Sequence, residues 1–206
     1  MTSVMPAPTQ PIVEGHGLVL RGWDDDLIPQ LAGWGHRGFP YHAFDLGHLH
    51  DPFRRASTLS RYRDVAQHRH YIACEDGVPV GRVSVNLNDA TGLYLWSVHV
   101  PPEHERRGVC RRMLAALMES LVADFPGRDF ALTTNTFATT AHRAYEALGF
   151  RTLETRWHYD REIAEQLWRV PHEVRAPIAT HIRFHNGRWE VRVFFMKRPA
   201  GAPQSP

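Results

Sequence analysis

The chain has 206 residues, of which 43% are hydrophobic, and its basic and acidic residues nearly balance at a net charge of +2. A chain of this length can bury most of its apolar surface in one core, so the composition excludes a small scaffold that depends on disulfides or a structural metal. Because no continuous basic stripe accompanies the near-neutral charge, we expect no nucleic-acid partner.

The sequence lacks the patterns of membrane and secreted proteins. No apolar run approaches about 18 residues, and no charged segment is followed by a signal-like apolar one, so we expect neither a membrane partner nor secretion. We predict a cytoplasmic protein in which Cys74 and Cys110 are reduced thiols. Its 14 histidines have no Cys partners or helical His-x-x-x-His spacing, so we predict no metal site.

Before residue 93 the pattern predicts ordinary elements and one irregular stretch. Prolines and small polar residues indicate disordered tails over 1–12 and 199–206 around a single domain over 13–198. The irregular stretch, 33–52, is rich in glycine, histidine and aromatics, and we interpret it as part of a substrate wall. In chain order we also expect a strand over 17–23, a helix through 27–31 capped by Asp24, Asp25 or Asp26, a helix over 53–67, and strands over 69–74 and 78–87 that form a hairpin.

The stretch from Leu93 to Leu121 reads as a strand, a tight basic loop and a helix. The strand ends at two prolines, the loop contains a single glycine, and the helix has apolar residues at helical spacing. A helix that begins on such a loop directs unpaired N–H groups and the positive end of its dipole at whatever lies there. The loop therefore suits an anion such as a pyrophosphate.

Two aromatics on the central strand, Tyr94 and Trp96, share one face of it. They are equally well explained as core residues and as the lining of an acceptor pocket. Later in the chain we expect a strand over 130–134, a helix capped by Thr139 or Thr140 that ends at Gly149, a strand to Tyr159, an extra helix over 161–169, and a hairpin of 181–185 with 188–196.

Two motifs carry a resemblance to a known family. The run from Val98 to Cys110 resembles the acyl-CoA signature of the GNAT superfamily of N-acyltransferases, (Gln or Arg)-x-x-Gly-x-(Gly or Ala) after a strand. The run from Ala141 to Phe150 resembles the family's helix that ends in Tyr-x-x-x-Gly-Phe. Both occur in the family's order and spacing, and the resemblance covers roughly residues 17–159.

The resemblance implies an α/β (α+β) fold: a mixed, mostly antiparallel twisted sheet flanked by helices, here with an extra C-terminal helix and hairpin. It also implies acetyl-CoA, or another acyl-CoA, as co-substrate. The backbones of Val98, His99 and Val100 would pair with pantetheine, and the pyrophosphate would lie on the loop and helix start formed by Arg106, Arg107, Gly108, Val109, Cys110 and Arg111.

Three positions depart from the family pattern. Glu105 stands where Gln or Arg is usual, Cys110 where Gly or Ala is usual, and Ala138 where members often have Asn. A carboxylate repels a pyrophosphate, so binding of the pyrophosphate must depend on Arg106, Arg107 and backbone amides. Cys110 either fills a small-residue position or acts as a nucleophile at a helix start; we favour the first.

The implied reaction is direct transfer of the acyl group to an amine, with Tyr145 as the general acid that protonates the leaving thiolate. The sequence does not identify the base, for which His99, Glu103 and an early histidine are all candidates. An aromatic, His-rich wall favours a small-molecule amine as acceptor. The alternatives are an acyl-CoA-binding protein with little or no transferase activity and a protein N-acetyltransferase. The resemblance also allows a homodimer. We expect residues 160–188 to select the acceptor or to cover a sheet edge.

Overall fold

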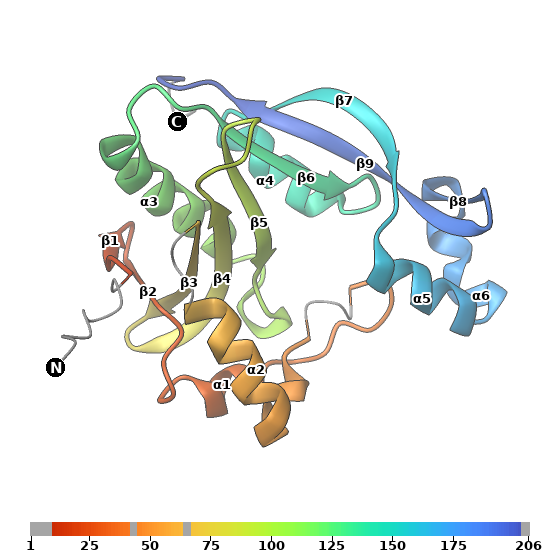
Figure 1. Ribbon diagram of the computed structural model, residues 1–206, viewed down its shortest axis with the longest axis horizontal. Helices are drawn as coiled ribbons and strands as arrows, with labels where there is room; N and C mark the ends of the chain where they lie inside the picture. The colour runs from red at the N-terminus through yellow and green to blue at the C-terminus, as the bar shows by residue number, and fades with distance from the viewer. Residues whose placement is uncertain (1–9, 42–44, 64–66, 203–206) are drawn as a thin grey trace, which may run out of the picture.

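The computed structural model describes residues 10–41, 45–63 and 67–202. Its centre is one sheet in the order β1-β2-β3-β4-β5-β6-β9-β7, with β8 paired to β9 (Figure 1). All pairs are antiparallel except β5 with β6. The strands are β1 (Val13–Gly15), β2 (Leu18–Arg21), β3 (His68–Glu75), β4 (Val78–Asn86), β5 (Leu93–His99), β6 (Phe130–Asn135), β7 (Arg151–His158), β8 (Ile182–His185) and β9 (Arg188–Arg198). The mixed, mostly antiparallel sheet confirms the predicted fold class.

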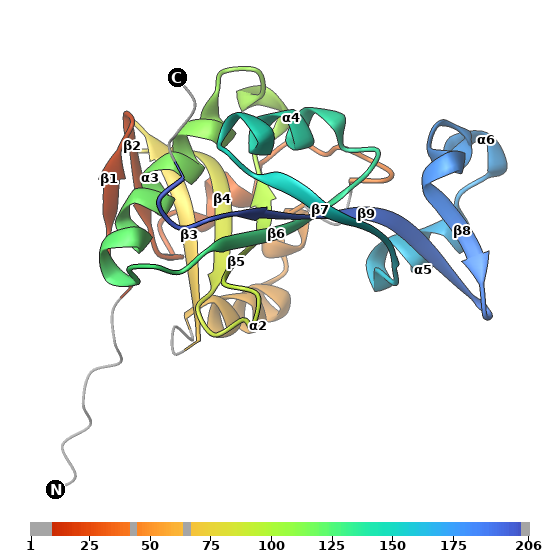
Figure 2. The ribbon, with the colours of Figure 1, turned by 90° about the horizontal axis from the view of Figure 1, so that it is seen from above.

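Helices cover both faces of this sheet. Along β3, Tyr71 and Ala73 belong to the core beneath α3, whereas Ile72 and Cys74 belong to a second core beneath α1 and α2. This alternation follows from the two-residue period of a strand. Figure 2 shows α3 and α4 on one side of the sheet and α2 on the other. The helices are α1 (Ile28–Ala32), α2 (Pro52–Arg63), α3 (Val109–Asp124), α4 (Thr139–Ala147), α5 (Arg161–Arg169) and α6 (His172–Arg175), with 3₁₀ turns η2 (Gly47–His50), η3 (Pro102–His104) and η4 (Ala176–His181).

Most predicted elements are confirmed, but both capping predictions are wrong. The side chains of Asp24 and Asp26 bond to Arg21 at 2.8 and 3.2 Å instead of capping α1. Thr139 is the first residue of α4, and the N-cap is Ala138. Strand β1 was not predicted, because three residues are too few to show a period.

The predicted tails lie mostly outside the described residues, which exclude 1–9 and 203–206. Gln10, inside the first predicted tail, bonds to the backbone of His70 in both directions. Its amide donates to the His70 carbonyl at 2.7 Å and accepts from the His70 N–H at 2.8 Å. The described chain is therefore attached to β3 from residue 10 onward.

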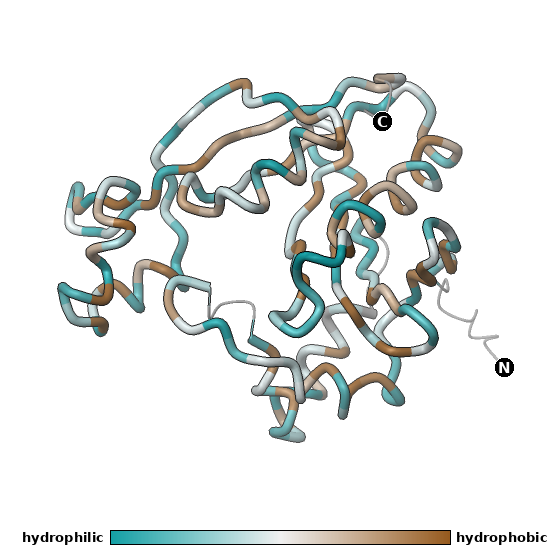
Figure 3. Tube along the Cα trace, turned by 180° about the vertical axis from the view of Figure 1, so that it is seen from behind, coloured by the Kyte–Doolittle hydropathy of each residue, from teal (hydrophilic) through white to brown (hydrophobic). Residues whose placement is uncertain are grey.

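The segment between β7 and β9 forms the extra helix and hairpin that the sequence predicted. Asp160 caps α5 by accepting from the N–H of Ile163 at 3.0 Å. Ile163 and Leu167 are buried against Val191 and Val193 of β9. Figure 3 shows hydrophobic and hydrophilic residues interleaved along this insert, as expected for an element with its own small core and a face in water.

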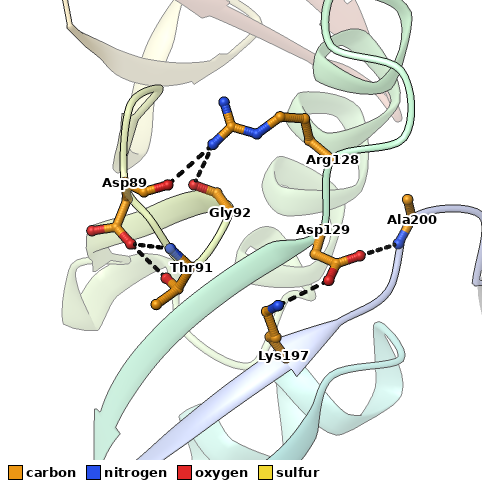
Figure 4. A network of polar contacts seen from close by, with 7 residues as sticks. All are labelled: Asp89, Thr91, Gly92, Arg128, Asp129, Lys197 and Ala200. Carbon is orange, nitrogen blue, oxygen red and sulfur yellow. Dashed lines mark hydrogen bonds and ion pairs between the residues drawn. The ribbon is translucent and has the colours of Figure 1, made fainter.

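A polar network fastens the closed end of the β5–β6 pair (Figure 4). The guanidinium of Arg128 donates to the carbonyls of Leu87, Asp89 and Gly92 at 2.8, 3.2 and 3.0 Å. The neighbouring Asp129 accepts from Lys197 and from the N–H of Ala200, both at 2.9 Å. The turn before β5, the start of β6 and the end of β9 are therefore held together by two adjacent residues.

Gly92 is required at this junction. Its φ is 137°, and a Cβ there would lie 2.4 Å from the carbonyl oxygen of Asp129. That oxygen accepts the N–H of Leu93 at 2.8 Å, the contact at which β5 and β6 meet. No L side chain fits without moving one of the two strands.

We predict that Gly92→Ala lowers the free energy of unfolding by about 2–4 kcal/mol, because backbone strain and a steric clash add together. Gly127→Ala is the matched control: its φ is also positive, at 79°, but a Cβ there meets nothing within 4 Å. The control should lose only the backbone cost, about 1–2 kcal/mol. Urea unfolding measures both, and equal losses would contradict the role assigned to Gly92.

Candidate active site

Strands β5 and β6 are paired at one end and separate at the other. The parallel ladder joins Leu93–Leu95 to Phe130–Leu132. Beyond it, among the described residues, β5 continues to His99 beside β4 alone and β6 continues to Asn135 beside β9 alone. Figure 1 shows the two strands diverging. Their facing edges offer backbone N–H and C=O groups to a chain laid between them.

A bulge in β5 lies at this opening. Arg82 of β4 pairs with His99 and Ser84 pairs with Trp96, so Ser97 and Val98 stand opposite a single residue of β4. Ser97 has a positive φ of 52°. A bulge bends its strand and re-aims the side chains beside it, which accounts for the change of direction after the paired segment.

The loop after β5 presents backbone N–H groups at the start of α3. Arg106 and Gly108 both adopt left-handed conformations, with φ of 58° and 73°. Gly108 is the N-cap of this 16-residue helix, and a Cβ there would meet nothing within 4 Å. Arg106, Arg107 and Arg111 are exposed around it. Free helix N–H groups, the dipole and these guanidinium groups together make the loop suited to an anion, as the sequence predicted.

Glu75 holds two of the nearby arginines in place. It accepts from Arg107 and from Arg112, both at 2.8 Å. The hydrogen bond from Arg112 and the charges of Arg112, Arg107 and His104 lower the pKa of Glu75, so this half-buried carboxylate is ionised at neutral pH. Part of the positive charge of the loop is therefore balanced before any anion binds.

The sequence places a carboxylate, Glu105, where it would repel a pyrophosphate. In the structure this charge is paired with an arginine that the sequence analysis did not single out. The guanidinium of Arg37, from the early loop (the irregular stretch 33–52 between α1 and α2), forms an ion pair with Glu105 and donates to the carbonyl of Val100. In the same place Gly35 donates its N–H to Glu103 at 3.4 Å. Glu105 is thus neutralised by a partner that lies far away in the sequence, and the early loop is fixed against the end of β5.

Tyr145 brings the two sequence motifs together. It is buried, with 6% of its surface exposed. It belongs to the same core cluster as Val109, and Val98 and Cys110 pack against that cluster. Burial, and to a lesser extent the nearby Cys110, raises the pKa of the phenol above its usual value. The ring meets Phe150 edge to face at 6.2 Å, and the turn after α4 contains Gly149, where φ is 86°. The hydroxyl therefore stays protonated at every physiological pH.

Cys110 and His99 are both poor acid–base groups in this fold. Burial raises the pKa of the Cys110 thiol to about 12, which argues against a thiolate nucleophile at the helix start. Burial and the charges of Arg82 and Arg37 lower the pKa of His99 to about 3, so its imidazole is neutral and weakly basic. Its ring packs near Trp34, with centroids 5.6 Å apart.

A cavity of about 700 Å³ opens beside the diverging strands. Trp96, Ser97 and Asn135 line the end nearest β5 and β6. The rest of the lining comes from the early loop, α2, β4 and the insert: Asp45, Leu46, His48, Phe53, Arg54, Ser57, Thr58, Tyr62, Arg82, Asp160, Glu162 and Ile163. The early loop thus forms a wall of the cavity, as the sequence suggested.

The structure separates the two aromatics that the sequence grouped. Trp96 lines the cavity, whereas Tyr94 is not among the lining residues because it lies where β5 is still paired with β6 and β4. Sequence reasoning did not single out Arg82, Asp160 or Glu162. No local pattern could have found them, since they come from β4 and from the insert, which meet only in the fold.

The described residues contain neither a cluster of metal-ligating side chains nor a membrane-spanning helix. Within them no group of three or more His, Cys, Asp or Glu side chains is arranged to hold a metal ion. No helix in the described part of the chain combines the length and apolar character needed to cross a membrane.

Solved structures share this fold at low sequence identity. A GNAT-family acetyltransferase from Bacillus anthracis is 9% identical with a TM-score of 0.63, over 92% of this chain and 98% of that one. The ribosomal-protein-S18-alanine N-acetyltransferase from Escherichia coli is 15% identical with a TM-score of 0.56, over 90% and 96%. The spermidine N-acetyltransferase from Vibrio cholerae, solved with CoA and spermine, is 13% identical with a TM-score of 0.57, over 89% and 96%.

The sequence itself matches a family model, although comparison with curated proteins finds no match. The model is described as Acetyltransferase (GNAT) family and matches residues 33–150, more than half of the chain. This range runs from the early loop to the end of α4 and includes both motifs and the diverging strands. The chain therefore belongs to the GNAT family of acyl-CoA-dependent N-acetyltransferases.

Proposed function

We propose that this enzyme transfers an acetyl group from acetyl-CoA to a primary amine of a small molecule by direct attack. The observation that carries the proposal is the opening between β5 and β6, which has a helix start suited to an anion on one side and a cavity on the other. An extended thioester laid in this opening would place its acyl carbon between the two.

The co-substrate would be held mainly by backbone. The N–H groups of Val98 and Val100, on either side of His99, are assigned to the pantetheine. The pyrophosphate is assigned to the loop and helix start, Arg106, Arg107, Gly108, Val109, Cys110 and Arg111. Support comes from the left-handed backbone at Arg106 and Gly108, which leaves space for close approach of a phosphate.

In the proposed step the neutral amine attacks the thioester carbonyl, and donors on the open edge of β5 stabilise the oxyanion. The C–S bond then breaks, the thiolate takes a proton from Tyr145, the new amide nitrogen loses its extra proton to water, and the tyrosinate regains a proton from water. Burial keeps the phenol protonated, so it holds a proton when the thiolate forms, and places it beside Cys110 at the start of α3. Proximity supplies much of the acceleration, since both reactants are aligned before reaction.

A small-molecule acceptor is favoured over a protein because the insert adds a further wall to the cavity. Asp160, Glu162 and Ile163 of α5 and its N-cap face the early loop and α2 across it. The solved relatives include both a spermidine and a ribosomal-protein enzyme, so they favour neither class of acceptor. An acyl-CoA-binding protein without transferase activity is the second candidate. Calorimetry with acetyl-CoA followed by free-thiol release over an amine panel separates the two, since binding without release on any amine would favour the second.

We predict that replacing Arg106 and Arg107 by Ala weakens binding of CoA more than binding of a pantetheine fragment that lacks the nucleotide pyrophosphate. Each lost guanidinium–phosphate contact should cost roughly 3- to 10-fold in affinity for CoA only. Isothermal titration calorimetry measures both ligands, with Arg161→Ala on the exposed face of α5 as the control. An equal loss for the two ligands would refute the placement of phosphates on this loop.

We predict that Tyr145→Phe lowers kcat by roughly 10²- to 10⁴-fold with little change in CoA affinity, because it removes the proton donor and keeps the ring packing. Tyr71→Phe, another buried tyrosine of the same core, is the control. With the raised pKa of Tyr145, the wild-type rate should rise with pH as the acceptor amine deprotonates and then stay level through pH 10. Turnover of Tyr145→Phe within about twofold of wild type at saturating acyl-CoA would reject the role.

A further inference from the structure

The acceptor cavity contains one charged side chain that is deeply buried. Arg82 lines the cavity from β4, and only 5% of its surface is exposed. The hydroxyl of Tyr62 is a hydrogen-bond partner of its guanidinium, and the charges of Glu162 and Asp45 act on it from further away. An arginine cannot lose its proton in a protein, so the fold maintains a cation beneath the place where an acceptor would lie.

The carboxylates of the lining are engaged elsewhere or face water. Asp45 pairs with His36 at 3.1 Å and accepts the N–H of Arg37 at 3.3 Å. Asp160 caps α5 through the N–H of Ile163 at 3.0 Å. Glu162 is exposed, and so is the other lining arginine, Arg54. Charges in water are screened more strongly than buried ones, and Arg82 is the most deeply buried charged residue of the lining.

We infer that this cavity takes an amine that also carries a carboxylate, as an α-amino acid does, and that Arg82 binds the carboxylate. The inference rests on the proposed function and specifies its acceptor. A guanidinium presents its N–H donors as a planar fork that matches both oxygens of a carboxylate, and the pair is strongest where water is excluded. Lysine or a neutral donor would not provide this geometry.

The position of Arg82 also suits the reaction. It pairs with His99 across the β4–β5 ladder, next to the bulge at Ser97, and Ser97 and Trp96 line the same cavity. Neighbouring strands lie about 4.8 Å apart, so a ligand held by the side chain of Arg82 lies one strand away from the open edge of β5. A carboxylate on Arg82 therefore directs the adjacent amine toward the open edge of β5.

The first test needs no variant. Wild-type kcat/KM is measured with matched pairs that differ only in the carboxylate: tryptophan and tryptamine, phenylalanine and phenethylamine, histidine and histamine, with spermidine alongside. The amino acid of at least one pair should exceed its decarboxylated partner by roughly 10- to 100-fold, the discrimination typical of a charge-assisted contact. If the decarboxylated amines or spermidine are favoured in every case, the inference is overturned. That result would indicate a cationic acceptor bound by the carboxylates of the cavity lining.

Binding gives a second readout that does not depend on turnover. Quenching of tryptophan fluorescence, to which Trp96 in the cavity contributes, reports binding of each pair member in the presence of CoA. The same carboxylate preference is expected, and its absence would overturn the inference even if no amine were acetylated. If amines are acetylated but those with a carboxylate are not preferred, only the role assigned to Arg82 is rejected. If CoA binds and no amine is acetylated, the proposed function is rejected.

Variants then assign the preference to one residue. Arg82→Met should reduce kcat/KM for the preferred amino acid by at least 100-fold and its decarboxylated partner by less than 10-fold; Arg82→Lys should restore only part of the preference. Arg161→Met controls for loss of an arginine near the insert. Glu162→Gln removes a competing charge, so the carboxylate preference should persist or increase. A preference unchanged in folded Arg82→Met would overturn the assignment.

Discussion

The structure depends on one parallel strand pair that is closed at one end and open at the other. Arg128 and Asp129 fasten the closed end through backbone carbonyls, Lys197 and the chain beyond β9. The bulge at Ser97 lies toward the open end. Because the strands are held so near the point where they separate, the opening is part of the folded state and a ligand does not have to create it. Preorganisation of this kind lowers the entropic cost of binding.

The early loop connects the two halves of the site. Arg37 contacts both the end of β5, at Val100, and the basic loop, at Glu105. The same loop supplies Asp45, Leu46 and His48 to the acceptor cavity, and Phe39 packs against the core of the insert. One segment therefore touches the region assigned to the co-substrate and the region assigned to the acceptor. An isolated carboxylate would repel a phosphate, but Glu105 is paired with Arg37 and so holds the early loop in place.

Burial sets the protonation states around the opening. Removal from water disfavours the charged form of each group, so the phenol of Tyr145 and the thiol of Cys110 keep their protons and His99 remains neutral. Arg82 is the exception, since a guanidinium stays charged even when buried. The region around the opening thus combines neutral hydrogen-bonding groups with the permanent cation of Arg82, a different arrangement from the exposed arginines around the start of α3.

The sequence alone determined the features that are local in the chain. The strand, basic loop and helix from Leu93 to Leu121, the hairpins at Asp76-Gly77 and Asn186-Gly187, and the helix over Arg161–Arg169 follow from period, turn residues and hydrophobic spacing. The two family motifs, which lie within such elements, indicated the fold class and the co-substrate. Tertiary structure decided the rest: the ion pair of Arg37 with Glu105, the cavity built from the early loop, α2, three strands and the insert, and the buried position of Arg82. Each of these depends on side chains tens of residues apart, which only the packing of the sheet and its helices brings into contact.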